Sequence, residues 1–511
     1  MQHKLTIPHQ IFLAGERYRD RVAIRGEDGV DILYRDLEPA VRQVAAAMVA
    51  GGVAFGDRVA IWAPNRPEWV LIALGLQAAG AVLVPLNTRL KGREAAHILG
   101  KSGAKLLFTV RGYLDTDYLG LLDGFDLPEL ADRIDIGDAD IWRAFLARGQ
   151  GHEAEVGRRL DALGEDDLSD ILFTSGTTGL PKGAMTAHGQ NLTLFRTYAD
   201  KLGLRAGDVY LVVNPFFHSF GYKAGWLSSL ISGATVLPHA TFDAASVLRR
   251  VEAERVTVLP GPPTLYHSLL AGPWASHDLS SLRLAITGAA SVPETLIYEM
   301  RNSLGIDVVL TAYGLTENCG VVTMCEADDP VAVIANTAGR TIPGVEVKIV
   351  DETGTMAAPG DPGELLVRGV GVMRGYFEDE AATAKAIDAD GWLHTGDVAV
   401  ADAAGNIRIT DRRDDVFIVG GFNAYPAEIE RLLAAHPAIS QTAVIGVPDE
   451  RLGSVARAFV VLRPGQRLDA AELTAWCRQN MANYKVPRQI DFVESLPQNA
   501  AGKVQKFLLR Q

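Results

Sequence analysis

The stretch that most constrains this chain is TSGTTGLPKG at residues 174–183. It follows the apolar run Ile171–Phe173, which is typical of a buried strand that ends in turn residues. Its glycines let the backbone approach a ligand closely, while its hydroxyls and Lys182 supply donors for an anionic oxygen. A polar surface turn is the plain alternative. The strand before the loop and the lysine within it favour a phosphate site, but not the common P-loop, because no Ser or Thr follows the lysine.

The overall composition bounds the class of protein. With 511 residues, the chain is too long for one core, so we expect two or more domains. A hydrophobic content of 48% with 22% charged residues is ordinary for a soluble globular protein. The formal charge of −13 argues against nucleic acid or an anionic membrane surface as a partner.

Cysteine content and the longest apolar segment indicate a cytoplasmic protein. The three cysteines, Cys319, Cys325 and Cys477, include no CxxC pair, so a reducing compartment fits. Trp69–Leu86 is long enough to be considered as a membrane span, but its glycines and Pro85 favour a buried helix followed by a buried strand. We therefore expect no stable membrane insertion.

Strand and helix patterns alternate along most of the chain, which predicts an α/β fold with a largely parallel sheet. From about 345 to 411 the pattern changes to short strands between Gly, Asp and Pro turns, which predicts a small antiparallel barrel. Residues 149–167 are polar and acidic, and we expect a surface connector there. The expected strands are Val22–Ile24, Val59–Trp62, Ala81–Leu86, Tyr210–Asn214, Thr235–Leu237, Thr257–Leu259, Leu284–Thr287, Val308–Leu310, Val345–Val350, Glu364–Arg368 and Ile407–Thr410.

Five consecutive charged residues at 411–415 mark a domain boundary. A new α+β pattern follows, with a helix that begins at Pro426, strands at Thr442–Val447 and Ala458–Leu462, and a helix over 470–482. We expect a large N-terminal domain, 1–413, and a small C-terminal domain, 414–511.

Three more polar stretches follow expected strands or turns. They are YGLTE at 313–317, GWLHTGD at 391–397 and PQNAAGK at 497–503. Taken singly, each has a plain interpretation: a helix N-terminus with an acid in its first turn, a turn, and a solvated lysine near a chain end.

The order of these motifs resembles that of the adenylate-forming superfamily, which includes acyl- and aryl-CoA synthetases, non-ribosomal adenylation domains and firefly luciferase. The full set is TSGTTGLPKG, PFFHSFG at 215–221, YGLTE, GELLVRG at 363–369, WLHTGD at 392–397, DRRDD at 411–415 and GK at 502–503. The resemblance covers essentially the whole chain. It implies an AMP-forming acid–thiol ligase that uses ATP, Mg²⁺ and coenzyme A, with a small-molecule carboxylic acid and CoA as partners. A homodimer is one assembly that the sequence leaves open.

The resemblance also implies residue roles. The residues expected at the β- and γ-phosphates of ATP are Thr174, Ser175, Gly176, Thr177, Thr178, Gly179 and Lys182, with Thr316 also at phosphate. Those expected at adenine are Tyr313 and Gly314, and those along adenine and the acyl group are Gly288, Ala289 and Ala290. Asp397 and Arg412 are expected at the ribose. Glu317 would bind Mg²⁺. Lys503 would reach the carboxylate and the α-phosphate as a catalytic residue, and His218 would gate the passage between acid and thiol. Asp414 matches the hinge, and Gly420 and Gly421 match the segment that lines the tunnel for CoA.

The predicted acyl pocket is FFHSFGYKAGW at 216–226, whose aromatic residues suggest a roomy, flat-walled cavity. Phe217, Tyr222 and Lys223 are its candidate lining residues. Lys223 has two interpretations, a side chain that extends to solvent or a donor for an oxygen at the far end of the acid. GYKAG at 221–225 and VLPGPPTLYHSLL at 258–270 look closest to the CoA-ligase branch that activates the indanedione propanoate left after steroid rings A and B are degraded, which implies a polycyclic oxygenated propanoate as substrate.

Several alternatives remain open at this point. The pocket segment is also compatible with a medium-chain, long-chain or aryl fatty-acid CoA ligase. A stand-alone adenylation domain would need an acidic residue for an amino group, and none is evident at the start of the pocket helix. A non-catalytic nucleotide- or acyl-binding relic is disfavoured because Glu317, Asp397, Arg412 and Lys503 are all present. No sequence feature supports luciferase-like oxidation.

Overall fold

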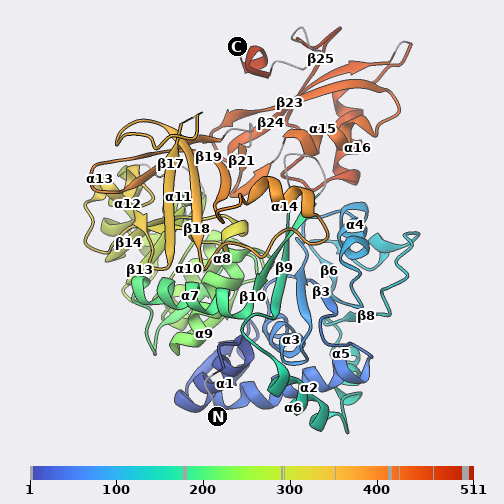
Figure 1. The fold of residues 1–511 in the computed structure, drawn as a ribbon, viewed down its shortest axis with the longest axis vertical. Coiled ribbons are helices and arrows are strands. Elements are labelled where there is room, and N and C mark those ends of the chain that lie inside the picture. Colours follow the sequence, from blue (N-terminus) through green and yellow to red (C-terminus); the bar gives the residue numbers. More distant parts are fainter. Residues whose placement is uncertain are drawn as a thin grey trace.

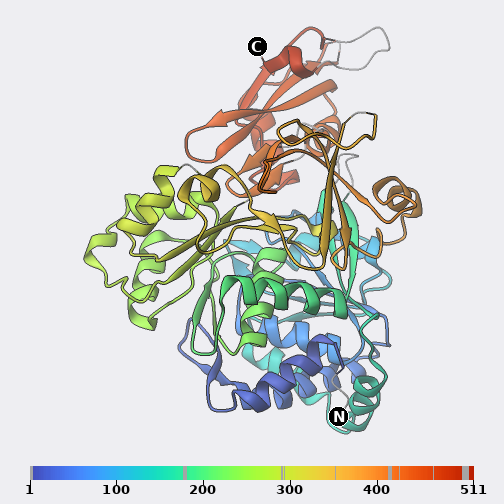
Figure 2. The same cartoon turned by 60° about the vertical axis from the view of Figure 1, so that its left-hand side comes forward.

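A computed structural model describes residues 4–175, 181–288, 292, 294–351, 353–412, 417–424, 426–463, 465–497 and 506–510. Figures 1 and 2 show a large body that carries the N-terminus at one end and a smaller unit that carries the C-terminus at the other.

The first sheet of the large body has six strands in the order β10-β9-β4-β3-β5-β8. All its pairs are parallel except the β9–β10 hairpin. Its central strands are short apolar runs that are buried along their length, as expected for a parallel sheet covered on both faces. The bounds are β3 Arg58–Trp62, β4 Val82–Pro85, β5 Leu106–Thr109, β8 Asp132–Asp135, β9 Leu168–Ser175 and β10 Pro181–Ala187.

The second sheet consists of two four-stranded halves, β11-β12-β1-β2 and β13-β14-β15-β16. Val258 joins them, because it forms one isolated parallel bridge to Tyr210 and another to Leu284. The expected strand Thr257–Leu259 is thus reduced to this bridge. The bounds are β1 Val22–Arg25, β2 Asp31–Leu33, β11 Val209–Val212, β12 Thr235–Pro238, β13 Leu284–Gly288, β14 Val308–Tyr313, β15 Thr323–Met324 and β16 Arg340–Thr341.

The third sheet of the large body is antiparallel, in the order β17-β18-β19-β20. It confirms the predicted change of pattern after residue 345. Its third strand corrects the prediction for 391–397: that stretch enters a nine-residue strand rather than a turn, with a register shift near Val398 that lets the chain bend. The bounds are β17 Val345–Val350, β18 Gly363–Gly369, β19 Leu393–Ala401 and β20 Ile407–Arg412; β6 Arg111–Tyr113 and β7 Thr116–Asp117 form a separate ribbon.

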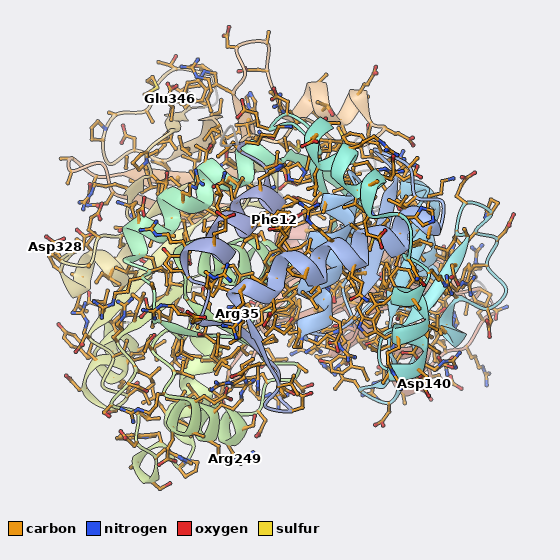
Figure 3. The ribbon with its side chains drawn as sticks, turned by 90° about the horizontal axis from the view of Figure 1, so that it is seen from below. Phe12, Arg35, Asp140, Arg249, Asp328 and Glu346 are labelled. Atoms are coloured by element: carbon orange, nitrogen blue, oxygen red, sulfur yellow. The ribbon has the colours of Figure 1, made fainter. Side chains whose placement is uncertain are left out.

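Helices cover the sheets. Pro67 begins α3, whose residues Trp69–Ala78 are apolar apart from Gln77 and buried except at Leu71, so the stretch considered as a membrane span is a core helix followed by β4. No described helix is long and apolar enough to cross a membrane. Figure 3 shows α1 and α2 across the face of the body opposite the C-terminal unit, with Phe12 and Arg35 near its centre. The bounds are α1 Ile7–Arg17, α2 Tyr34–Ala50, α3 Pro67–Ala78, α4 Gly92–Ser102, α5 Ala139–Ala147, α6 Glu153–Ala162, α7 His188–Leu202, α8 Ser219–Gly221, α9 Ser228–Ser232, α10 Ala244–Glu254, α11 Pro263–Ala271, α12 Glu294–Asn302, α13 Val331–Asn336 and α14 Glu380–Ala386.

The predicted connector at 149–167 is wrong in part, because it contains α6. This helix buries Val156 and Leu160 while its acidic residues stay at the surface. Two inward positions four residues apart are enough to dock a short helix but too few to stand out in a charged sequence.

The C-terminal unit has its own sheet, β22-β21-β24-β23 with β25 paired to β24. Its core extends from Phe417 to Val486 and is a separate cluster from that of the large body, which extends from Ile7 to Ile407. Helix α15 begins at Pro426, as predicted, and buries Ile429 and Leu433 in this core. The bounds are β21 Phe417–Val419, β22 Phe422–Ala424, α15 Pro426–Ala434, β23 Ile439–Asp449, β24 Gly453–Leu462, α16 Ala470–Asn480 and β25 Gln489–Phe492.

Candidate active site

Glu317 lies where the first and second sheets meet. It sits in a short 3-10 turn (Thr316–Asn318, η4) just after β14, and its Oε1 accepts hydrogen bonds from the hydroxyls of Thr174 (3.1 Å) and Tyr376 (3.0 Å). Thr174 is at the carboxyl end of β9, directly before the glycine-rich loop. The structure therefore brings together two motifs that are 143 residues apart in the chain.

Tyr376 is a member of this cluster that the sequence did not predict. The Lys182 ammonium lies 5.3 Å from the centre of the Tyr376 ring, so this side chain contacts both the phosphate-loop lysine and Glu317. Residues 374–377 reach this position by pairing with the edge of β10: Arg374 N–H donates to the Met185 carbonyl and Phe377 N–H to the Gly183 carbonyl. A four-residue RGYF segment without periodicity carries no signal of this pairing in the sequence.

Tyr313 and Asp397, predicted at adenine and ribose, are hydrogen-bonded to each other. Tyr313 is at the end of β14, and its hydroxyl donates to Asp397 Oδ2. Asp397 is buried on β19 opposite Arg412 of β20 in the backbone register. The Arg412 side chain lies outside the described set. The end of the second sheet is thus joined to the antiparallel sheet at the predicted nucleotide site.

Gly288 ends β13 beside Ala312 of β14. A Cβ at Gly288 would lie 2.6 Å from the Ala312 carbonyl oxygen, so only glycine lets the two strand ends approach this closely. Gly314 follows β14 and leads into η4. Both glycines lie at the carboxyl edge of a parallel sheet, where ligands of α/β proteins bind.

His218 lies in the loop after β11, at the same edge of the sheet. Buried Asn65 holds this loop: its amide donates to the carbonyls of Val212 and Asn214, and its Oδ1 accepts from Phe216 N–H. The His218 ring is exposed, yet the surrounding protein lowers the pKa of its imidazole below the ordinary value. Desolvation disfavours the charged imidazolium and so favours the neutral ring.

Tyr222 and Lys223 have partners that the sequence did not suggest. Lys223 is fully buried, and its ammonium lies 3.0 Å from Asp170 Oδ1 and donates to Thr186 Oγ1 (2.9 Å). The Tyr222 hydroxyl accepts a hydrogen bond from the Gln77 amide at 2.9 Å. The interpretation of Lys223 as a side chain that extends to solvent is therefore wrong, because Asp170 on β9 compensates its charge inside the protein.

The aromatic residues of the 216–226 segment mostly contribute to the core. Phe216, Tyr222 and Trp226 are fully buried and pack around Trp69 of α3. Phe217 is half-buried. Aromatic content in this segment thus reflects helix packing as well as any cavity wall, and the segment contains a single π-helical turn, Tyr222–Leu227 (η2).

Gly420 and Gly421 form the two-residue turn between β21 and β22. Their φ values of 56° and 86° are both left-handed, which a type I′ hairpin turn requires and glycine allows without strain. A Cβ at Gly421 would lie 3.6 Å from Pro262 of the large body, so the turn lies against the segment that precedes α11.

Several predicted site residues lie outside the described residues. They are Gly176, Thr177, Thr178, Gly179, Ala289, Ala290, Asp414 and Lys503. The backbone of Ser175 ends β9, but its side chain is not described. Their roles stay predictions.

Glu317 fits a shared magnesium site better than a protein-only site. Among the described residues, no three His, Cys, Asp or Glu side chains gather around a common point. Mg²⁺ is commonly held by one or two carboxylates together with substrate phosphates and water, and a single carboxylate beside the phosphate loop meets that requirement.

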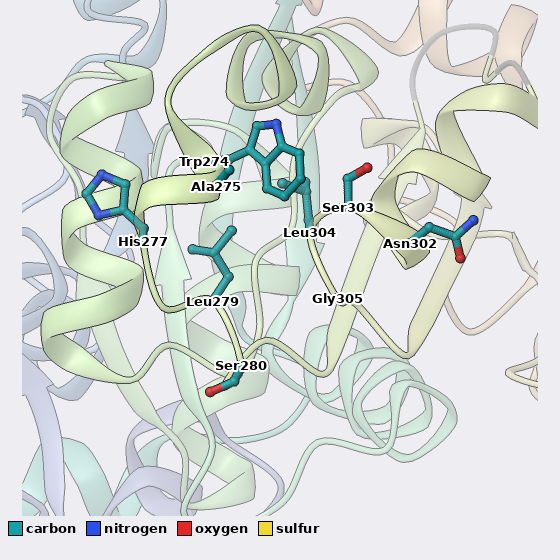
Figure 4. A pocket seen from close by; sticks show the side chains of 9 residues that line it. All are labelled: Trp274, Ala275, His277, Leu279, Ser280, Asn302, Ser303, Leu304 and Gly305. Carbon is teal, nitrogen blue, oxygen red and sulfur yellow. The ribbon is translucent and has the colours of Figure 1, made fainter.

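A shallow hollow of about 290 Å³ is lined by Trp274, His277, Leu279, Asn302, Ser303 and Leu304 (Figure 4). Its loops lead into β13 and β14, so it lies at the amino ends of these strands. Ligand sites in parallel sheets form at the carboxyl ends, so the hollow is separate from the candidate site.

Comparison with known proteins agrees with this geometry. Residues 12–377 match the family model for AMP-binding enzymes, and residues 428–503 match that for the AMP-binding enzyme C-terminal domain. The chain is 48% identical to the 3-[(3aS,4S,7aS)-7a-methyl-1,5-dioxo-octahydro-1H-inden-4-yl]propanoyl:CoA ligase of Mycobacterium tuberculosis and 46% identical to that of Rhodococcus jostii, each over 99% of this chain and 98% of the relative.

Two solved structures differ in how well they superimpose. The o-succinylbenzoate CoA synthetase of Bacillus subtilis, bound to a CoA product analogue, has a TM-score of 0.83 at 29% identity and covers 98% of each chain. ATP-bound MatB of Rhodopseudomonas palustris has a TM-score of 0.71 at 30% identity and covers 99% of this chain and 98% of its own. The fold is therefore that of adenylate-forming enzymes, with a large α/β domain and a small C-terminal one. With both family models matched in order along the chain, this protein belongs to the AMP-binding enzyme family.

Proposed function

We propose that the protein is an AMP-forming acyl-CoA synthetase. A carboxylate oxygen attacks the α-phosphorus of ATP and expels pyrophosphate, which gives an acyl-AMP. The CoA thiol then attacks the acyl carbon and expels AMP, which gives the acyl-CoA. The observation that carries this proposal is the cluster of Thr174, Glu317 and Tyr376 beside Lys182, which joins the phosphate loop to the carboxyl edge of the second sheet.

The residues of this chain act by orienting ATP and compensating its charge. Thr174 and Lys182 contact the β- and γ-phosphates, while Tyr313 and Asp397 bind adenine and ribose. Glu317 and the phosphates would hold Mg²⁺, which supplies positive charge against the leaving pyrophosphate. Lys503 neutralises the charge that develops between the incoming carboxylate and the α-phosphate. Tyr376 keeps Glu317 oriented toward the loop.

We propose a polycyclic oxygenated propanoate, of the indanedione type formed in steroid degradation, as the acid. The support is that two relatives at 46–48% identity over almost the whole chain are named as ligases for such a propanoate. Phe217 and His218, at the carboxyl edge after β11, are the described residues best placed to border the acid.

The chain would work as two units, 1–413 and 414–511, that change their relative arrangement between the two steps. The separate cores on either side of residues 407–417 support this division. The thioester step requires an arrangement in which the CoA segment predicted at Gly420 and Gly421 lies at the acid side of the site. Gly421 next to Pro262 is consistent with that arrangement, because the carbonyl of nearby Pro260 accepts a hydrogen bond from Asn214 after β11, the strand end at which we place the acid.

Replacement of the predicted catalytic lysine tests the mechanism. Lys503→Ala should raise the barrier to acyl-AMP formation by about 2–4 kcal/mol, the usual effect of losing a donor to transition-state charge. Pyrophosphate release without CoA measures this step, and thioester formation from supplied acyl-AMP measures the other, which we expect to be spared. Equal loss in both steps would contradict the role of Lys503.

The acid is tested by a pyrophosphate-release screen over acids of graded size and oxygenation, with and without CoA. An indanedione propanoate should give a higher kcat/KM than a plain medium-chain alkanoate or an aryl acid. A preference for the alkanoate would overturn the substrate proposal and leave the ligase activity in place, whereas absence of pyrophosphate release with every acid would overturn both.

A further inference from the structure

Among the described residues, a second buried lysine lies between the two units. Lys485 follows α16 in the C-terminal unit and is 2% exposed. Its ammonium donates to Glu428 Oε1 and to Glu94 Oε1, both at 2.7 Å. Glu428 belongs to α15 of the same unit, but Glu94 belongs to α4 of the large body. One charge therefore bridges two separately packed cores.

Glu94 is held in place by the start of its own helix. It is the third residue of α4, and its Oε2 accepts a hydrogen bond from Lys91 N–H at 2.9 Å. This is half of a capping box, so the carboxylate keeps its orientation whether or not the C-terminal unit is docked. The acceptor for Lys485 is thus preformed on the large body.

The contact belongs to a continuous strip that ends at the predicted CoA segment. Next to Lys485, the Tyr484 ring stacks on Phe422 with centroids 4.8 Å apart, and the Arg89 guanidinium lies 4.9 Å from the Phe422 ring centre. Phe422 directly follows Gly421, which lies against Pro262. Holding Lys485 on Glu94 therefore also holds the Gly420–Gly421 turn at the site.

We propose that Lys485 is a positioning residue for the thioester half-reaction, and that its bridge between Glu428 and Glu94 holds the C-terminal unit in the arrangement that presents Gly420–Gly421 to the acid side of the site. This inference rests on the proposed two-step function. It concerns which arrangement is populated, and Lys485 itself touches neither substrate.

The charges at this contact make it breakable. Rotation of the C-terminal unit separates Lys485 from Glu94 but keeps it paired with Glu428, so no lone buried charge results. The docked triad holds two carboxylates for one ammonium, and within the described part of the chain Glu428 Oε2 is buried without a hydrogen-bond partner. An incompletely satisfied buried ion pair is only weakly stabilising, as a reversible contact requires. Burial by itself lowers the pKa of Lys485, but Tyr484 and the two carboxylate partners raise it well above its ordinary value, so the ammonium stays charged.

Glu94→Gln is the sharpest test, because glutamine can still accept the Lys91 N–H bond while it removes the charge opposite Lys485. We expect thioester formation from supplied acyl-AMP to fall about 5- to 10-fold, which corresponds to about 1–1.4 kcal/mol. Pyrophosphate release without CoA should stay within about twofold of the wild type. Glu38→Gln, which removes a carboxylate paired with Arg42 on α2, is the matched control and should change neither step.

Lys485→Met should give the same split, and Glu94→Gln combined with Lys485→Met should be no slower in thioester formation than Lys485→Met alone. If Lys485→Met fails to fold by circular dichroism, Glu94→Gln decides the matter. Equal loss in both steps, or no loss in either, for Glu94→Gln would overturn this inference. A wild type that releases no pyrophosphate with any acid would instead overturn the proposed function.

Discussion

Lys223 and Lys485 are both buried lysines paired with carboxylates, but the structure uses them differently. Lys223 and Asp170 are each 0% exposed and lie within the large body. Besides the lysine, the Asp170 carboxylate accepts hydrogen bonds from the side chains of Ser169, Thr186 and Asn191. At Lys485, by contrast, one of the two carboxylates belongs to the other unit, and Glu428 keeps an oxygen without a partner among the described residues.

This contrast shows how one type of interaction can fix a fold or leave it movable. A buried ion pair is stable only when hydrogen bonds satisfy its remaining polar atoms, because desolvation otherwise offsets the attraction. Asp170 meets that condition and ties the β9–β10 hairpin, which carries the phosphate loop, to the π-helical turn η2. The Lys485 triad does not fully meet it, so the contact between units can open.

The largest expected effect is at the fixed pair. Lys223→Met leaves the Asp170 charge buried without a cation and should lower the free energy of unfolding by about 3–5 kcal/mol, measured by urea denaturation. Asp170→Asn together with Lys223→Met removes both charges and should recover much of this loss. If Lys223→Met lowered the free energy of unfolding by less than about 1 kcal/mol, the view that the Lys223–Asp170 pair fixes the fold would be wrong.

The same variant also tests whether Lys223 acts only by supporting the fold or also contacts the substrate. If Lys223 acts only through Asp170, Lys223→Met should raise KM equally for an oxygenated polycyclic acid and for a plain alkanoate. A selective rise for the oxygenated acid would restore the predicted contact between Lys223 and the substrate.

The corresponding change at the movable contact should cost less stability. Lys485→Met should lower the free energy of unfolding by about 1–2 kcal/mol, because the units can separate and let water reach Glu94 and Glu428, which limits the penalty of unpaired charge. Denaturation in parallel with Lys223→Met is the measurement. A loss of stability as large as that of Lys223→Met would mean that the Lys485 contact between the units does not open more readily than the Lys223–Asp170 pair.

The smallest expected effect is at the Gly420–Gly421 turn, which the Lys485 contact holds at the site. Gly421→Ala places an alanine in the left-handed conformation that glycine adopts there, with φ 86°, and should destabilise the C-terminal unit by about 1 kcal/mol. Gly465→Ala is a matched control, since its φ is 78° and its Cβ would meet no atom within 4 Å. Both variants should lower stability similarly, but only Gly421→Ala should slow thioester formation. Equal rates of thioester formation for the two variants would argue against a role of the turn at the site.

Much of the fold and the motif positions could be predicted from the sequence. Apolar runs such as Val59–Trp62 and Leu284–Thr287 become buried strands because their periodicity and bounding turns are local properties. The motifs at 174 and 313–317 lie at the carboxyl ends of strands for the same reason. Helix α6 and strand β19 were missed, because two buried positions and a bulged register leave weak local patterns.

The partners of the lysines could not be predicted. Lys485 and Glu94 are 391 residues apart, Lys223 and Thr186 are 37 apart, and the sequence around each reads as an ordinary charged or polar segment. Tyr376 likewise reaches Glu317 only because residues 374–377 pair with β10.

The sequence by itself determined the family, the order of its motifs and the alternation of strands and helices, because these depend on short-range patterns and on residue types that phosphate and carboxylate chemistry require. Only the tertiary structure decided which charges meet. The pairing of Lys223 with Asp170 and of Lys485 with Glu94 follows from how whole elements pack, since a buried charge is stable only beside a partner that folding brings to it.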